Sequence, residues 1–343
     1  MALNLGLLIF SFAVTSILII PFINLLYKLK FKRQKQTTKD AFGKRTPIFD
    51  KYHGLKAGTP VGGGLLIILV VTVLFAILFP ILKRAGVYIT HNHPLRDELN
   101  IIFFTFLSFG LLGLYDDSLK LFGVKKSKFF GLRLRHKFII QWILAFIIAS
   151  LMYFNLHLDI VNVPFFGVLD MGVIFIPVAA FVIVTFANAV NITDGLDGLA
   201  SGILMITLFS LWLLSAAILD VPLSIFLALW IGSLIAFLYF NIYPARIFLG
   251  DVGSLAFGAT IAVIGLMVGK IFAVFIMGGI FLVELLSSLL QLLSKKYRGK
   301  KVFPVAPLHL WFQLIGWEEP KIVMRAWLAA IMLAIFGLWI AIV

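Results

Sequence analysis

Long apolar segments dominate this sequence. A helix needs about 20 apolar residues to cross roughly 30 Å of hydrocarbon. Segments of this kind lie at 4–27, 61–82, 99–115, 138–156, 172–190, 199–219, 223–241, 254–269, 271–293 and 327–343. Of the 343 residues, 62% are hydrophobic and 13% are charged, so the chain cannot cover its own surface with polar groups as a soluble domain does. We therefore predict an all-α polytopic membrane protein with about ten transmembrane helices, forming one integral membrane domain over 1–343.

The positions of the basic residues predict the orientation of these helices. Of the 29 Lys and Arg residues, 25 lie in alternate connections between the predicted spans, and only four lie on the other side. Because Lys and Arg accumulate in cytoplasmic loops, we expect both termini outside the cell. The same bias accounts for the net charge of +14 without a nucleic-acid partner. The absence of cysteine excludes disulfides, thiolate metal sites and cysteine nucleophiles.

Acidic residues cluster at the ends of spans that are expected on the cytoplasmic side. They are Asp116, Asp117, Asp194, Asp197 and Asp251, and none of them has a basic residue within two positions. An ionised side chain is costly inside a membrane, at about 3 kcal/mol in the bilayer centre. These carboxylates therefore need compensating charge. The candidates are Lys or Arg from neighbouring loops and a divalent cation, which prefers oxygen ligands.

The densest polar stretch is 188–200, which reads NAVNITDGLDGLA. Its Asn and Asp residues recur every three positions, a spacing that drifts around an ideal α-helix. A tighter or broken helix would bring these side chains together. We favour a polar ligand site over the alternative, in which Thr193 or Asp194 caps a helix.

Two shorter acidic stretches have open alternatives. Adjacent carboxylates at Asp116 and Asp117 repel each other unless a cation or a shared proton intervenes, but they could also be a solvated helix end. Asp251 lies between glycines at a predicted helix start, which suits a phosphate or a metal held near backbone N–H groups, or a simple cap. The three stretches together favour a site.

Further candidates lie in the basic connections. Lys56 precedes a glycine-rich turn and could meet phosphate oxygens, or serve only as a topogenic residue. His309 lies beside Trp311 in the last connection, where a satisfied or interfacial histidine is the alternative. Glu284 and Gln291 share a face of the predicted span 271–293, and we interpret both as buried hydrogen-bonding groups.

These motifs together resemble the MraY family of phospho-N-acetylmuramoyl-pentapeptide transferases. That family belongs to the polyprenyl-phosphate N-acetylhexosamine-1-phosphate transferase superfamily. The resemblance runs from about residue 53 to residue 327. It rests on KAGTP at 56–60, YDD at 115–117, the stretch 188–200, NIYPA at 241–245, FLGDVGSL at 248–255, MGG at 277–279 with Glu284 and Gln291, APLH at 306–309, and GWEEPK at 316–321 with Arg325 and Trp327.

The resemblance implies a fold and a reaction. The fold has ten helices, termini outside and a cytoplasmic active site, in the bacterial inner (cytoplasmic) membrane. The enzyme would transfer phospho-MurNAc-pentapeptide from UDP-MurNAc-pentapeptide to undecaprenyl phosphate, giving lipid I and UMP. The implied cofactor is Mg²⁺, and the implied partners are membrane lipid and a second copy of the chain in a homodimer.

The resemblance also implies roles for individual residues. The catalytic set would be Asp116, Asp117, Asp251, His309 and Lys56, with Asp251 as the main metal ligand and Asn191 near the metal. Asp116 or Asp117 would orient or deprotonate the lipid phosphate. Phe248 would offer a stacking face to uracil. The substrate-binding set would be Thr59, Asn188, Asp194, Asp197, Asn241, Phe248 and Gln291.

One segment departs from the family pattern. MraY proteins typically carry three consecutive histidines, followed two positions later by an acid, but this chain reads His309-Leu310-Trp311 and then has Gln313. The departure favours one alternative function, a sister transferase that uses GlcNAc-1-phosphate or another hexosamine-1-phosphate. The GWEEPK segment opposes that alternative. A catalytically inactive lipid-binding homologue and a transporter are further alternatives. A transporter fits less well, because its charged site would lie near the membrane midplane.

Overall fold

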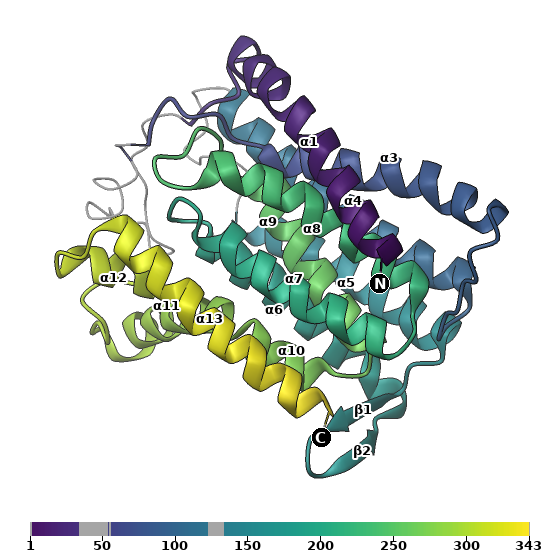
Figure 1. Ribbon diagram of the computed structural model, residues 1–343. Coiled ribbons are helices and arrows are strands. Elements are labelled where there is room, and N and C mark those ends of the chain that lie inside the picture. The colour runs from purple at the N-terminus through teal and green to yellow at the C-terminus, as the bar shows by residue number, and fades with distance from the viewer. Residues whose placement is uncertain (1, 34–53, 55, 123–133, 343) are drawn as a thin grey trace.

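The computed structural model describes residues 2–33, 54, 56–122 and 134–342, and it consists mainly of long helices packed side by side (Figure 1). Within these residues nine helices are long and apolar enough to cross a membrane. They are α1 (Ala2–Lys28), α3 (Gly63–Arg84), α4 (Leu95–Phe122), α5 (Leu134–Leu156), α6 (Phe175–Thr193), α7 (Leu199–Ala217), α8 (Val221–Asn241), α9 (Gly250–Met267) and α13 (Glu319–Ile342). The prediction of a helical membrane protein is confirmed.

Helices α8 and α9 form the buried centre. Helix α9 packs against α4 and α6, and α8 packs against α1 and α7. Helix α13 packs on the other side of α7, so that α1 and α13 lie on opposite flanks of the α8–α7 pair (Figure 1). The outer helices expose apolar side chains such as Ile17 on α1 and Met332 on α13, as expected of a surface that faces lipid.

The predicted span 271–293 is not one straight helix. It is divided into α10 (Ile271–Met277) and α11 (Gly279–Arg298), which meet at an angle of 78° and together could form a tenth span. A side chain on Gly278 would come within 2.8 Å of the Phe186 ring, so the glycine allows the break to pack closely against α6. Helix α11 buries a stripe containing Glu284, Ser287 and Gln291 and exposes leucines on its other face.

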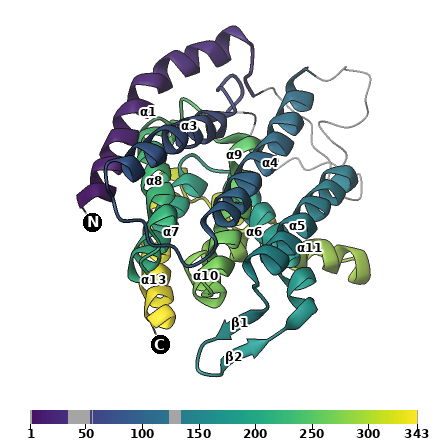
Figure 2. The ribbon, with the colours of Figure 1, turned by 90° about the vertical axis from the view of Figure 1, so that its right-hand side faces the viewer.

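A small antiparallel hairpin joins α5 to α6 and was not expected from an all-α prediction. Its strands are β1 (Ile160–Val163) and β2 (Gly167–Asp170), with Ile160 opposite Asp170. A 3₁₀ turn, η1 (Gly172–Ile174), leads from the hairpin into α6. The hairpin lies near the C-terminal end of α13 (Figures 1 and 2), and the short helix α12 (Leu308–Leu314) lies at the opposite end of the bundle (Figure 1).

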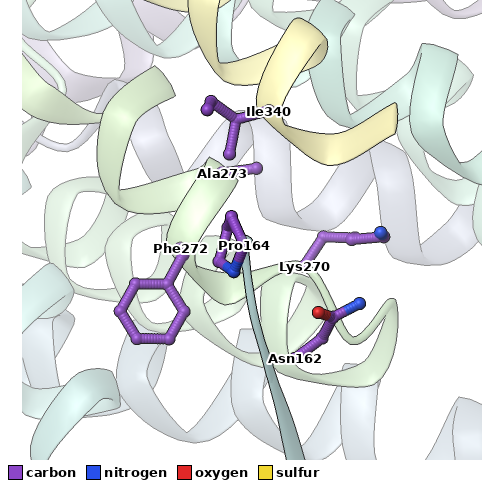
Figure 3. A pocket seen from close by; sticks show the side chains of 6 residues that line it. All are labelled: Asn162, Pro164, Lys270, Phe272, Ala273 and Ile340. Atoms are coloured by element: carbon purple, nitrogen blue, oxygen red, sulfur yellow. The ribbon is translucent and has the colours of Figure 1, made fainter. Parts of the chain in front are cut away.

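The hairpin borders a small hollow beside α10 and α13 (Figure 3). The residues that line it are Asn162, Pro164, Lys270, Phe272, Ala273 and Ile340. An isolated two-stranded hairpin is only marginally stable in water, so these contacts with α10 and α13 contribute to holding it in place.

Glycines bring the start of α9 into close contact with α3 and α4. A side chain on Gly113 of α4 would lie 2.1 Å from the carbonyl oxygen of Asp251, and one on Gly64 of α3 would lie 2.2 Å from the Cα atom of Gly253. Small residues at membrane helix crossings let backbones approach in this way. The first turn of α9, which carries Asp251, is thus held between α3 and α4.

We expect Gly113→Ala to lower the stability of the protein by about 1–3 kcal/mol, because the added methyl group overpacks the α4–α9 crossing against main-chain atoms. The measurement is thermal unfolding in detergent. Gly6→Ala on α1 is the control, because no atom lies within 4 Å of its added methyl group. Equal melting temperatures for the two variants would contradict the account of this crossing.

Candidate active site

The predicted acidic residues lie at one end of the helix bundle. Asp116 and Asp117 are in the last turns of α4, Asp251 is in the first turn of α9, and Asn191 is near the end of α6. The hairpin that precedes α6 in the chain lies at the other end (Figure 1). Because α4 and α6 end where α9 begins, residues more than 130 positions apart come into contact.

Two lysines lie among the carboxylates of this acidic cluster and offset part of their charge. The Lys120 Nζ atom lies 3.0 Å from Asp116 Oδ2 and 2.7 Å from Asp251 Oδ2. The Lys137 Nζ atom, from the start of α5, lies 3.0 Å from the same Asp116 oxygen and also contacts Asp251 Oδ2. The sequence left two sources of compensating charge open, which were basic residues from neighbouring loops and a divalent cation. The structure shows the first of these.

Neutral partners fix the orientation of the carboxylates. Asn191 Nδ2 donates to Asp251 Oδ1 at 3.0 Å and to Ser254 Oγ at 2.7 Å. The backbone N–H of Val252 donates to Asp117 Oδ2 at 3.1 Å. Asp116 and Asp117 are 2% and 3% exposed, so they are not a solvated helix end. The helix-cap alternative for Asp251 is also wrong, because the residue lies inside the first turn of α9, after Leu249 at the cap position.

The cluster has carboxylate oxygens of the kind that Mg²⁺ prefers, but the ammonium groups of Lys120 and Lys137 lie between them. Among the described residues, no three His, Cys, Asp or Glu side chains are arranged to hold a metal ion together. Mg²⁺, however, is usually bound by one or two carboxylates together with substrate phosphates and water. Asp251 and Asp116 offer such carboxylates, and the ammonium groups between them lie where positive charge is needed. The residues fit the ion if a lysine moves aside.

A second cluster surrounds Lys56. Its Nζ atom donates to Asp197 Oδ1 at 2.6 Å, to Glu319 Oε1 at 2.5 Å and to the carbonyl oxygen of Gly195 at 3.3 Å. Asp197 also accepts from the backbone N–H of Ala245 at 2.9 Å. The Lys56, Asp197 and Glu319 side chains are at most 10% exposed, so Lys56 is more than a topogenic surface residue.

Asp194 and Phe248 border the Lys56 cluster. Burial raises the pKa of Asp194 to about 8, against the opposing effect of the Arg33 charge, so that this carboxyl is mostly neutral at pH 7. The Arg33 guanidinium lies 5.2 Å from the centre of the Phe248 ring, and Lys56 Nζ lies 5.8 Å from it. A cation over an aromatic face is attracted to the ring. The face of Phe248 is therefore held beside positive charge.

His309 is a buried residue supported by Glu284. Its backbone N–H and its Nδ1 atom both lie 3.1 Å from Glu284 carboxylate oxygens. The ring reaches the turn after α6, because a side chain on Gly195 would come within 2.4 Å of His309 Nε2. At 2% exposed, His309 is not an interfacial residue, whereas its contacts with Glu284 agree with the other alternative, a satisfied buried histidine.

Some of the predicted residues lie outside these clusters. Asn188 donates to Gln141 Oε1, and Asn241 donates to the carbonyl oxygen of Ile247. Gln291 accepts from the backbone N–H groups of Val302 and Phe303 and so holds the segment after α11. Thr59 contributes its carbonyl oxygen to the N–H of Arg33. None of these contacts tests the proposed substrate roles of the four residues.

The helix is broken within the stretch 188–200, but the break does not bring the Asn and Asp side chains together as expected. Helix α6 ends at Thr193, Asp194 is its C-terminal cap, and α7 begins after Gly198. The break sends Asn191 to the Asp251 cluster and Asp197 to the Lys56 cluster, whereas Asn188 lies beside Gln141. The N-cap alternative is wrong, and Asn188, Asn191 and Asp197 each contact a different group of residues.

Three residues of these clusters were not among the predicted site residues: Lys120, Lys137 and Glu319. Lys120 follows Asp116 by four residues, which places both on one helix face, so helical spacing could have indicated it. Lys137 and Glu319 approach their partners only through the packing of α5 and α13, so no local spacing indicates them.

Comparisons with known proteins show which family this sequence is similar to. The family model described as Glycosyl transferase family 4 matches residues 99–269, which include Asp116, Asn191 and Asp251. A phospho-N-acetylmuramoyl-pentapeptide-transferase of Acetivibrio thermocellus is 38% identical over 333 residues, covering 96% of this chain and 92% of the relative.

Relatives of the same name from other bacteria are similarly close. The Aquifex aeolicus protein is 36% identical over 347 residues, covering 94% of this chain and 91% of its own length. The Clostridium perfringens protein is 37% identical over 317 residues, covering 92% and 90%. Because these relatives are 36–38% identical over more than nine-tenths of its length, the chain belongs to the phospho-N-acetylmuramoyl-pentapeptide transferase family.

Proposed function

We propose that this protein transfers phospho-MurNAc-pentapeptide from its UDP-linked donor to undecaprenyl phosphate, releasing UMP. An oxygen of the lipid phosphate attacks the phosphorus next to the sugar. The new P–O bond forms as the bond from that phosphorus to the UMP oxygen breaks. The observation that carries the proposal is the cluster of Asp116, Asp251, Lys120 and Lys137 at one end of the bundle, where a lipid-borne and a water-soluble phosphate could meet.

The proposed orientation places this end of the bundle at the cytoplasm and both termini outside. It rests on the excess of Lys and Arg in the connections at this end. A UDP-linked donor is a cytosolic anion, and a polyprenyl phosphate keeps its chain in the bilayer. The site therefore has to lie at the inner face of the bacterial cytoplasmic membrane. A homodimer, implied by resemblance, is part of the same proposal.

The chain's own residues would act mainly by positioning. A phosphate monoester has a second pKa near 6, so the lipid phosphate is mostly doubly ionised at neutral pH and hardly needs a strong base. Lys120 and Lys137 would offset the repulsion between the two anions. Asp116 or Asp117 would orient the lipid phosphate, and Asn191 would keep Asp251 in place. Phosphoryl transfer depends largely on such positioning and on charge stabilisation.

We further propose that Asp251 holds Mg²⁺, with Asn191 near it and Asp116 as a second carboxylate. When bound, the ion would neutralise charge on the diphosphate and on the departing UMP. The donor set supports this proposal, because hard cations prefer carboxylate oxygens. The lysines now between the carboxylates would then turn towards phosphate oxygens.

We propose that the nucleotide-sugar lies beside the Lys56 cluster. Lys56 would contact phosphate oxygens, Phe248 would face the uracil, and the neutral Asp194 could donate a hydrogen bond. His309, held by Glu284, would border the same space. In this chain the positions of the second and third family histidines carry apolar side chains. Leu310 is buried, and the ring centres of Trp311 and Phe303 lie 5.7 Å apart.

We expect Asp251→Ala to abolish UMP release in Mg²⁺, with a loss of roughly 10²- to 10³-fold or more, because the main carboxylate of the cluster is removed. Expression should be unchanged. Mn²⁺ binding to the purified protein, followed by electron paramagnetic resonance, should weaken in parallel.

The matched control is Asp170→Asn on the exposed strand β2, at the other end of the bundle. This variant should keep its activity and its Mn²⁺ binding. If Asp251→Ala retained more than a tenth of the wild-type rate, Asp251 would not be the metal ligand.

We expect the protein to release UMP from UDP-MurNAc-pentapeptide at least tenfold faster than from UDP-GlcNAc when each is offered with undecaprenyl phosphate. The reason is the family membership and the GWEEPK segment at 316–321. Faster release from UDP-GlcNAc would identify the protein as the sister transferase, which the altered histidine run favours.

A further inference from the structure

Glu319 joins three segments that are far apart in the chain. It is the first residue of α13, and its Oε1 atom accepts from Lys56 Nζ and, at 2.6 Å, from the backbone N–H of Asp197. Lys56 itself precedes α3, and Asp197 lies in the turn between α6 and α7. The carboxylate of Glu319 therefore holds both a side chain and a main-chain segment of the Lys56 cluster.

The contacts of Lys56 use all of its hydrogen-bonding capacity. An ammonium group has three N–H donors and no acceptor. The structure provides three acceptors, which are the carboxylates of Asp197 and Glu319 and the carbonyl oxygen of Gly195. The direction of the Lys56 side chain is thereby fixed. Without Glu319, a long flexible side chain with a single carboxylate partner would regain rotational freedom.

The position of α13 does not depend on Glu319 alone. Trp327 Nε1 donates to the carbonyl oxygen of Gly198 at 3.0 Å. A side chain on Gly202 would come within 2.1 Å of the Trp327 ring, so the indole is packed tightly against α7. Loss of the Glu319 charge should therefore leave the helix in place and act on Lys56.

Arg33 adds a second positive charge beside this cluster. It interacts electrostatically with Asp194 and Asp197, and its guanidinium lies 5.2 Å from the centre of the Phe248 ring. The Gly195 carbonyl is the most distant acceptor of Lys56, at 3.3 Å, compared with 2.6 Å to Asp197. A phosphate oxygen could replace that carbonyl while both carboxylates stay bound.

We propose that Glu319 is a positioning residue of the transfer reaction, which holds the Lys56 ammonium in the direction needed to meet a phosphate oxygen of the nucleotide donor. This inference rests on the proposed function. It adds a residue that touches neither substrate but acts through Lys56.

The test is a double-mutant cycle with Lys56→Gln, Glu319→Gln and the double variant. Rates of UMP release give kcat and KM for the UDP-linked donor. We expect Glu319→Gln to lower kcat/KM about tenfold or more in the wild-type background, and less than about twofold once Lys56 is replaced, because contacting residues are not additive. Glu319→Asp, which keeps the charge, should restore part of the loss.

The chain offers a matched control in the adjacent acid. Glu318 is exposed, and Glu318→Gln removes the same charge from the same helix end without touching Lys56. It should leave kcat/KM within about twofold of the wild type. The melting temperatures of the Glu318 and Glu319 variants show whether either substitution unfolds the protein.

Three results would overturn the inference. They are additive losses in the cycle, an unchanged kcat/KM in Glu319→Gln, and an equal loss in Glu318→Gln. If Glu319→Gln does not fold, the same cycle is measured with Glu319→Asp. Additive losses of kcat/KM in that cycle would also contradict the proposal. If the wild type released no UMP, the proposed function would fail, and the cycle measured on UDP binding by calorimetry would still decide whether Glu319 acts through Lys56.

Discussion

Carboxylates buried at the end of an apolar helix bundle must be matched by positive charge, and this constraint shapes the polar part of the structure. Asp116 and Asp117 are almost completely buried, and leaving a buried charge unpaired costs several kcal/mol. Lys120 and Lys137 provide the match by contacting Asp116 and Asp251 together. Three helices, α4, α5 and α9, are thereby joined through charge at the point where their apolar contacts end.

Close contacts between helices also occur at this end of the bundle. Gly113 and Gly64 have no side chain where α4 and α3 meet the first turn of α9, so the main chain around Asp251 lies directly against its neighbours. Gly195 leaves room for the His309 ring in the turn after α6. Apolar packing thus sets the distances between the helix backbones, and the polar side chains form contacts across those distances.

The two charged clusters suit two different tasks in the proposed transfer. The Asp251 cluster has two lysines and three carboxylates around one region, as expected where phosphates meet a metal ion. The Lys56 cluster holds one lysine in a fixed direction beside an aromatic ring, as expected where a nucleotide is recognised. The break at 194–198 connects them, because Asn191 lies just before it in α6 and Asp197 lies within it.

Local sequence properties were sufficient to predict much of this protein. Long apolar runs require helices because a membrane cannot satisfy open backbone groups, and the acids at 116, 117 and 251 stood out because carboxylates are rare in such a chain. Lys120 could also have been predicted from local spacing, because it follows Asp116 by four residues. Tertiary structure alone decided the rest. Lys137, Glu319 and Glu284 meet their partners through the packing of helices distant in sequence. The bend at Gly278 packs closely against Phe186 on α6, which is distant in the sequence. Spacing along the chain reports which side chains share a helix face, whereas the partner of a buried charge is chosen by whichever helix packs beside it.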